Sequence, residues 1–343
     1  MTTTLALGED WPDLREAVAK ICARYPGEYW RRLEDQHAYP TEFIQELTHA
    51  GFLGALIPEE YGGSGLPLRA AAVILETINR HGCTASQGHA QMYIMGTLLR
   101  HGSEAQKREF LPGIARGELR LQAFAVTEPT TGSDTTRLKT RAVREGDHYV
   151  VTGQKVWTSR ALHSDLMLLL ARTTPLESCS KRIDGLSVFI VDIRESLGQG
   201  LAIRPLQAMF NHNTTEVFFD GLRVPAKNLI GTEGKGFTYI LDGLNAERTL
   251  IAAGNTAAGL VLAGTLIALA IPLAAMLATS HIWLDIVVWG LVAVILQLAT
   301  FVLAVVVFRN LRAMIEADNV AAAAALVGVQ IAIALLNAAA MAG

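Results

Sequence analysis

The chain has 343 residues, with 29 Lys and Arg against 32 Asp and Glu, and a net charge of −3. This balance gives no electrostatic basis for binding nucleic acid. Three cysteines, Cys22, Cys83 and Cys179, are too few and too scattered for a disulfide framework, so we expect a reducing compartment. Only five of the charged residues lie beyond Arg248, so a charged globular sequence is followed by an almost wholly apolar one.

The N-terminal part, residues 11–117, is predicted to be helical. Phe43, Leu47 and Phe52 recur at near-helical intervals, and Ser103 with Gln106 forms the pattern of a helix capping box. The first residues, "MTTTLALGEDWPD", have neither the basic nor the apolar region of a signal peptide. We therefore expect this domain to stay in the cytoplasm.

The spacing of apolar residues changes from a helical to a strand-like pattern at Leu121. Short runs rich in β-branched and aromatic residues follow, separated by turn signals such as "EGD" and "TG". They predict a small antiparallel sheet domain that ends near residue 234, and helical character returns at Phe237. The predicted order is helices, then a sheet, then a helix, which is an α+β fold.

The C-terminal tail is predicted to cross a membrane three times. Residues 257–278, 286–308 and 320–341 are each long and apolar enough to span a hydrocarbon layer of about 20 residues. The alternative is a buried helical hairpin inside a soluble fold. Three successive uncharged segments of this length favour the transmembrane prediction.

The charges of the tail also predict its orientation. Arg309 and Arg312 lie between the second and third predicted spans, and no Lys or Arg lies between the first and second. The positive-inside rule places the arginines in the cytoplasm. We therefore expect a multi-pass protein of the inner (cytoplasmic) membrane, with its N-terminal domain in the cytoplasm.

Two short segments carry possible chemistry. In "AVTEPTTGSD", residues 125–134, a strand ends in a Glu-Pro turn, and the loop offers hydroxyl and N–H groups to a phosphate or a heteroaromatic edge. In "TGQKVWTSR", residues 152–160, Trp157 could offer a flat face and Thr158 and Ser159 two hydroxyls. The alternatives are an ordinary hairpin turn and a core tryptophan.

Other types of site find no support in the sequence. The spacing of His81, Cys83 and His89 matches no zinc pattern, so we predict no metal site. No Gly-x-Gly-x-x-Gly follows a predicted strand, which argues against a Rossmann dinucleotide site.

Together, these segments resemble the acyl-CoA dehydrogenase family. The resemblance runs from about Trp11 to Ala253 and includes "IPEEYGGSGL", "HGSEAQKREFLPGIARGE" and the stretch from "RPLQAMFNHN" to "LNAER". It implies an N-terminal helical domain, a central β domain and a C-terminal helical bundle. It also implies FAD bound between domains and between the subunits of a homo-oligomer.

The resemblance assigns roles to individual positions. The loop that borders the flavin implies cofactor contacts from Phe124, Val126, Thr127, Gly132 and Ser133, and Ser133 also matches a position that contacts the CoA substrate. The segment beside the flavin ring adds Trp157, Thr158 and Ser159. Thr130 and Thr131 stand where Gly and Ala are commoner in the family, and "WTS" stands where "WIT" is commoner.

The implied reaction is α,β-dehydrogenation of an acyl-CoA thioester, with electrons passed to an acceptor such as an electron-transfer flavoprotein. Glu247 in "LNAER" matches the helix position from which some family members present their catalytic base, and Arg248 matches a position near the CoA moiety. A base of this kind needs an apolar pocket that raises its basicity. The alternatives are a structural ion pair, or a base placed in the C-terminal bundle.

The family pattern stops just after "LNAERTLIAA", and the expected bundle is replaced by the apolar tail, which resembles a family of small bacterial multi-span membrane proteins of unknown function. The predicted domains are thus 1–120, 121–234, 235–254 (the start of a truncated third domain) and 255–343. One reading is a membrane-tethered dehydrogenase, and the second is an inactive membrane protein carrying a relic flavoprotein domain. A third, an acyl-CoA oxidase on the same scaffold, predicts peroxide formation.

Overall fold

The computed structural model describes residues 11–132, 134–208 and 212–252, the helical residues 326–335, and five isolated positions between 292 and 300. Side chains are described only up to Leu244 in the helix that ends at Ala252. The chain forms two compact units. One comprises residues 10–250, and the other comprises residues 1–9 with 251–343.

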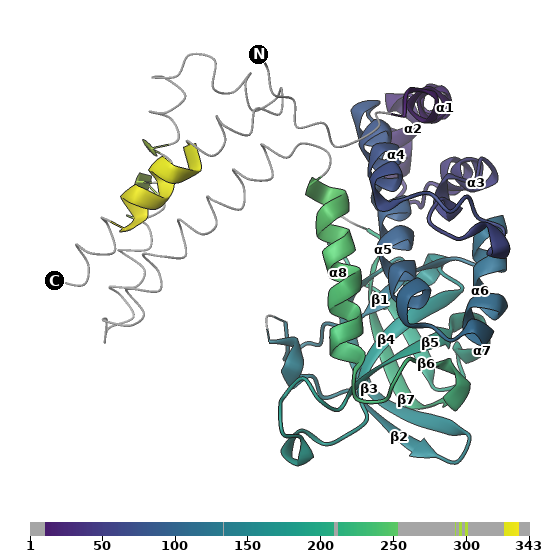
Figure 1. Ribbon diagram of the computed structural model, residues 1–343, viewed down its shortest axis with the longest axis vertical. Coiled ribbons are helices and arrows are strands. Elements are labelled where there is room, and N and C mark those ends of the chain that lie inside the picture. The colour runs from purple at the N-terminus through teal and green to yellow at the C-terminus, as the bar shows by residue number, and fades with distance from the viewer. Residues whose placement is uncertain are drawn as a thin grey trace. The chain divides into compact units, whose positions relative to one another are not determined.

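The N-terminal helical domain that the sequence predicts is present (Figure 1). The Ser103 hydroxyl accepts a hydrogen bond from the Gln106 N–H, and the Gln106 side chain accepts one from the Ser103 N–H, which confirms the predicted capping box. The helices are α1 (Pro12–Cys22), α2 (Gly27–Asp35), α3 (Thr41–His49), α4 (Leu68–Arg80), α5 (Ser86–His101) and α6 (Glu104–Arg116).

An eight-stranded sheet follows, in the order β6-β7-β3-β2-β4-β5-β8 with β1 beside β4. The predicted antiparallel sheet is confirmed for most strand pairs, with the exception that β4 pairs in parallel with both β1 and β2. The strands are β1 (Leu121–Ala125), β2 (Arg141–Glu145), β3 (His148–Ser159), β4 (Leu166–Arg172), β5 (Leu186–Asp192), β6 (Leu201–Pro205), β7 (Thr214–Pro225) and β8 (Leu229–Ile230), and a short helix, α7 (Ile193–Ser196), follows β5.

The central strand β4 is buried on both faces, which explains its unbroken apolar run. Alternate residues of a strand point to opposite faces of the sheet. Leu166, Leu168 and Leu170 belong to the cluster that joins the sheet to the helical domain. Met167 and Leu169 belong to a second cluster, with residues of β3, β5 and β7. β4 therefore contributes side chains to both hydrophobic clusters, one on each face of the sheet.

The helix α8 (Gly236–Ala252) begins where the sequence predicts and packs along α5. His101 Nε2 lies 2.8 Å from the Asp242 carboxylate, and the His101 ring stacks on Tyr239 with centroids 4.2 Å apart. A Cβ added at Gly243 would lie 2.9 Å from the Thr97 hydroxyl oxygen. This close approach places the middle of α8 against the helical domain (Figure 1).

The three predicted membrane spans fall almost wholly outside the described residues. Residues 326–335, within the third, are helical. Across the part of the chain that the structure describes, no helix combines the length and the apolar character needed to cross a bilayer.

Candidate active site

A cavity of about 310 Å³ lies between the sheet and the helices α5 and α8. Five of the eight predicted cofactor residues meet in it, although they come from two segments about 30 residues apart in the sequence. The residues that line it are Tyr93, Gln122, Phe124, Val126, Thr127, Thr135, Trp157, Ser159, Arg160 and Leu244. We call this cavity the β1–β3 pocket.

Trp157 owes its position to a β-bulge. Lys155 pairs with Val217 and Thr158 with Thr215, so two residues of β3 stand opposite one residue of β7. Trp157 occupies the extra position with a φ of 61°, a left-handed conformation that is unusual for a bulky side chain. Its side chain is 62% exposed, which contradicts the alternative of a core tryptophan. The bulge therefore places Trp157 in the lining of the pocket while leaving it largely exposed.

The two hydroxyl residues after Trp157 point in different directions. Ser159 lines the pocket, and its Oγ lies 3.5 Å from the Thr214 hydroxyl. Thr158 does not line the pocket, and its Oγ1 is buried with no hydrogen-bond partner among the described residues. Of the two predicted hydroxyl residues, only Ser159 lines this cavity.

The loop after β1 is anchored by a buried ion pair. The Lys155 ammonium lies 2.9 Å from the Glu128 carboxylate, and it also donates to the Val126 carbonyl at 2.9 Å. Glu128 accepts two further hydrogen bonds, from the N–H groups of Lys139 at 2.6 Å and Thr140 at 2.8 Å. The Lys155 side chain of β3 thus anchors the predicted Glu-Pro turn to the sheet.

Burial lowers the pKa of Lys155 to about 8, although Glu128 opposes this shift. Burial alone would raise the pKa of Glu128, but the Lys155 ammonium and the N–H groups of Lys139 and Thr140 bring it below its ordinary value. Both groups are therefore charged at neutral pH. The paired charges fix the loop without offering a free acid or base to the pocket.

The remaining predicted site residues lie elsewhere or outside the described part. Gly132 is exposed and does not line the pocket. Ser133 lies outside the described residues, as do the side chains of Glu247 and Arg248, whose backbone belongs to α8. Leu244, three residues before Glu247, lines the pocket.

Sequence reasoning missed half of the lining residues. Gln122 and Phe124 are two apart on β1, so the strand period could have assigned Gln122 to the same face as Phe124. Arg160 directly follows the "WTS" segment and could have been included with it. Tyr93 on α5 and Leu244 on α8 come from helices whose packing on the sheet no local pattern reveals.

The lining suits a flat aromatic ligand. Phe124, Val126 and Leu244 supply apolar walls, while Thr127 and Ser159 supply hydroxyl groups. Ligand sites commonly combine mainly apolar walls with a few placed polar groups. The described residues therefore fit a flavin ring, as the resemblance implies.

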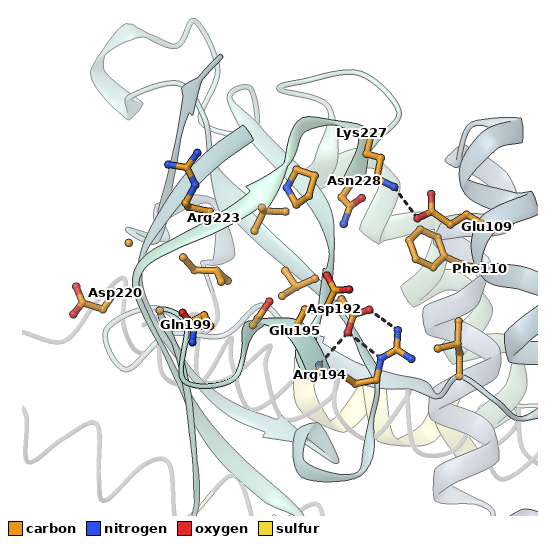
Figure 2. Close-up of a pocket in the computed structure, with 18 residues that line it drawn as sticks. Glu109, Phe110, Asp192, Arg194, Glu195, Gln199, Asp220, Arg223, Lys227 and Asn228 are labelled. Carbon is orange, nitrogen blue, oxygen red and sulfur yellow. Dashed lines mark hydrogen bonds and ion pairs between the residues drawn. The ribbon is translucent and has the colours of Figure 1, made fainter. Parts of the chain in front are cut away.

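A larger cavity of about 570 Å³ lies between α6 and the turns around α7 and the end of β7 (Figure 2). Two of its cations already have partners: Lys227 lies 2.8 Å from Glu109, and Arg194 lies 2.5 Å from Asp192. None of the predicted site residues lines it. This cavity is larger than the β1–β3 pocket, but its lining does not include the residues expected to bind the cofactor.

Comparison with protein families divides the chain into three matches. Residues 9–118 match the N-terminal domain of acyl-CoA dehydrogenases, and residues 123–222 match their middle domain. Residues 237–341 match a domain of unknown function, DUF350. The third match overlaps α8 and the apolar tail.

Curated relatives are identical to this chain at about a third of the aligned positions. Cyclohex-1-ene-1-carbonyl-CoA dehydrogenase of Syntrophus aciditrophicus is 34% identical over 257 residues, which cover 72% of this chain and 59% of that protein. Mitochondrial isovaleryl-CoA dehydrogenase of Pongo abelii is 31% identical over 254 residues, with the same coverage. The chain thus spans about three fifths of the length of these relatives.

Solved structures show the same fold. An acyl-CoA dehydrogenase of Geobacillus kaustophilus superposes with a TM-score of 0.67 at 24% identity, over 98% of this chain and 88% of that one. The structure of a glutaryl-coenzyme A dehydrogenase with glutaryl-CoA gives 0.65 at 26% identity, over 98% and 82%. Residues 9–118 and 123–222 of this chain therefore belong to the acyl-CoA dehydrogenase family, as its N-terminal and middle domains.

Proposed function

We propose that the chain is an FAD-dependent oxidoreductase that removes two hydrogens from the α and β carbons of an acyl-CoA thioester. Acyl-CoA dehydrogenases are FAD-dependent flavoproteins. The observation that carries the proposal is the meeting of Phe124, Val126, Thr127, Trp157 and Ser159 in one pocket. These residues match the family's flavin-contacting positions, and their chemistry suits a flat heteroaromatic ring.

The chain's own residues supply three parts of the mechanism. The apolar side chains of Phe124, Val126 and Leu244 would hold the flavin ring and exclude water, and Ser159 would supply a hydroxyl group to it. Glu247, one turn after Leu244 on α8, removes the α-proton. A carboxylate among apolar side chains is a stronger base than in water, because desolvation disfavours its charge. Bound FAD would accept the hydride from the β-carbon.

The visible spectrum of the full chain, purified in detergent, tests this proposal. Bound oxidised flavin should give an absorption that bleaches when an acyl-CoA is added without oxygen. In a Glu247→Gln variant the flavin should stay bound but the bleaching should be lost. Glu118→Gln changes an exposed glutamate on the surface and serves as the matched control. A flavin-loaded Glu247→Gln protein that bleaches at the normal rate would remove Glu247 from the mechanism.

Two other outcomes identify the competing functions. A folded but colourless protein, which gains no flavin spectrum on addition of FAD, favours an inactive protein with a relic domain. Rapid formation of peroxide after reduction by acyl-CoA favours an oxidase. A stable reduced flavin that is reoxidised by an electron-transfer flavoprotein supports the dehydrogenase and its proposed partner.

We also propose that the tail anchors the chain in the inner membrane and takes the place of the family's C-terminal bundle. The support is the near absence of charge beyond Arg248 and the length of the three apolar segments. The chain should remain with membranes after extraction at high pH. Protease added to sealed inverted vesicles should digest the N-terminal domain, because it faces the cytoplasm. Release of the chain at high pH would contradict the anchor.

A further inference from the structure

A third cavity of about 480 Å³ lies where the helical domain meets the turns beside β3 and β7. We call it the α5 pocket, because the first turn of α5 forms part of its wall. Trp30, Leu33 and Pro40 give it an apolar side, and Thr84, Ser86 and Asn213 give it polar groups. Arg160 lines both this cavity and the β1–β3 pocket.

Arg160 is a cation without a counter-ion in the described part of the chain. Its Nε has no surface exposed to solvent and no hydrogen-bond acceptor. Burial lowers the pKa of the guanidinium, and the neighbouring groups that oppose this effect are the phenols of Tyr93 and Tyr39 rather than a carboxylate. An arginine nevertheless stays charged, so its withdrawal from water has an uncompensated cost.

The backbone holds Arg160 in this place. The residue has a φ of 62°, and its N–H donates to the Asn213 carbonyl at 2.7 Å. Asn213 itself lines the α5 pocket. The direction of the Arg160 side chain is therefore set by the turn that follows β3 and by its bond to the start of β7.

The start of α5 adds a second positive feature. The first N–H groups of a helix have no partner within the helix, and the helix dipole gives this end a partial positive charge. The residue before α5, Ala85, has no side chain that could cap them, and the Ser86 N–H has only a long contact of 3.5 Å to the Thr84 hydroxyl among the described residues. Ser86 and Gln87, the first two residues of the helix, line the cavity, as does Thr84 just before it. Helix starts of this kind bind phosphate and other oxyanions.

The carboxylate of this cavity is already engaged. Glu34 lies 2.8 Å from His212 Nε2, and the His212 ring stacks on His37 with centroids 3.8 Å apart. No ion pair joins Glu34 to Arg160 among the described residues. Among the described residues, Arg160 and the start of α5 therefore have no carboxylate as a counter-ion.

We propose that the α5 pocket binds an oxyanion of the phosphate type, held by the Arg160 guanidinium and the first turn of α5. The guanidinium fork suits two phosphate oxygens. The Thr84 hydroxyl donates to Ser86 Oγ at 3.3 Å and the Ser86 hydroxyl donates to Gln87 Oε1 at 3.0 Å, so these hydroxyls reach a further oxygen by exchanging those bonds. The two pockets share Arg160, but Thr84, Ser86 and Gln87 line only the α5 pocket. Free phosphate and the phosphate of a nucleotide share this chemistry.

Calorimetric titration of the full chain with inorganic phosphate tests the site, with sodium chloride at equal ionic strength as the reference. The wild-type chain should bind phosphate and not chloride. Arg160→Gln should weaken binding by about tenfold or more, because a charge-assisted pair is lost. Arg141→Gln, which removes an exposed arginine of β2, should leave the affinity unchanged. A parallel titration with AMP separates a nucleotide, which would bind more tightly than phosphate, from the free ion.

Three results would overturn the proposal: no phosphate binding by the wild-type chain, unchanged binding by Arg160→Gln, or an equal loss in Arg141→Gln. If Arg160→Gln does not fold, the double variant Thr84→Ala with Ser86→Ala takes its place, and unchanged binding there also contradicts the site. The titrations need no flavin. Loss of the flavin would therefore contradict the proposed enzyme function and leave this test intact.

Discussion

The Lys155 ammonium lies in the protein interior, with no exposed side-chain surface, and joins β3 to the loop that follows β1. Removing one partner of a buried ion pair leaves the other charge without compensation. We expect Lys155→Met to lower the free energy of unfolding by about 3–5 kcal/mol. Urea unfolding followed by circular dichroism measures the change.

The double variant, with Lys155→Met and Glu128→Gln, should lose less stability than Lys155→Met alone, because no unpaired charge remains. A double variant at least as unstable as the single one would show that the carboxylate acts mainly through the N–H groups of Lys139 and Thr140.

The three cysteines should react differently with a thiol reagent. Burial raises the pKa of Cys22 to about 12, and burial also raises the pKa of Cys83. Cys179 is partly exposed. Because the thiolate is the reactive form, iodoacetamide at pH 8 should label Cys179 in the native chain and spare the other two. Mass spectrometry of the digested protein locates the label. Fast labelling of Cys22 would contradict its burial.

Among the elements, α6 depends on a short sequence signal. The Ser103 hydroxyl satisfies one of the free N–H groups at its start. Ser103→Ala should therefore lower the free energy of unfolding by about 0.5–2 kcal/mol. Thermal unfolding measures the loss, and Ser178→Ala, an exposed serine in a turn between β4 and β5, is the control. Equal effects of the two variants would rule out a specific capping contribution.

Local signals predicted the elements better than their pairing. The capping residues of α6 lie within four positions of each other, and the apolar run of β4 is continuous, so both are visible in the sequence. The parallel pairing of β1 with β4 joins residues more than 40 positions apart and has no local signature. The bulge at Trp157 likewise depends on the register against β7. For this reason the sequence could not decide whether the tryptophan lies in the core or beside the pocket.

In the candidate site, too, some residues have a local sequence signal and others are brought in only by the packing of the fold. The residues of the loop and the "WTS" strand could be recognised from their resemblance to a family. Tyr93, Arg160 and Leu244 enter the pocket through the packing of α5 and α8 and through a turn held by a bond to Asn213. Contacts of this kind depend on the assembled fold, so the sequence alone could not provide them.

For the molecule as a whole, we expect stability to fall in acid. Burial lowers the pKa of His163, although its hydrogen bond with Asn213 opposes the shift. The unfolded chain therefore takes up this proton more readily than the folded one as the pH drops below about 6.5, and folding loses stability. The lowered pKa of Glu128 adds a further loss when the pH falls through its folded value.

Urea unfolding at pH 7.5 and pH 5.5 measures this dependence. His163→Gln should show a smaller loss between the two values than the wild-type chain, because the proton uptake by the unfolded state is removed. Equal losses in the two proteins would exclude His163 as a source of the acid sensitivity.

The anchoring of the Glu-Pro turn has a consequence for the kinetics of ligand capture. Lys155 and Glu128 fix the Glu-Pro turn through buried side chains, so this turn has its conformation before a ligand binds. A ligand that enters such a cavity loses its own freedom but does not have to order the wall. Ligand binding should therefore follow a single phase whose rate depends on ligand concentration. The slower, concentration-independent phase that accompanies ordering of a loop on binding should be absent.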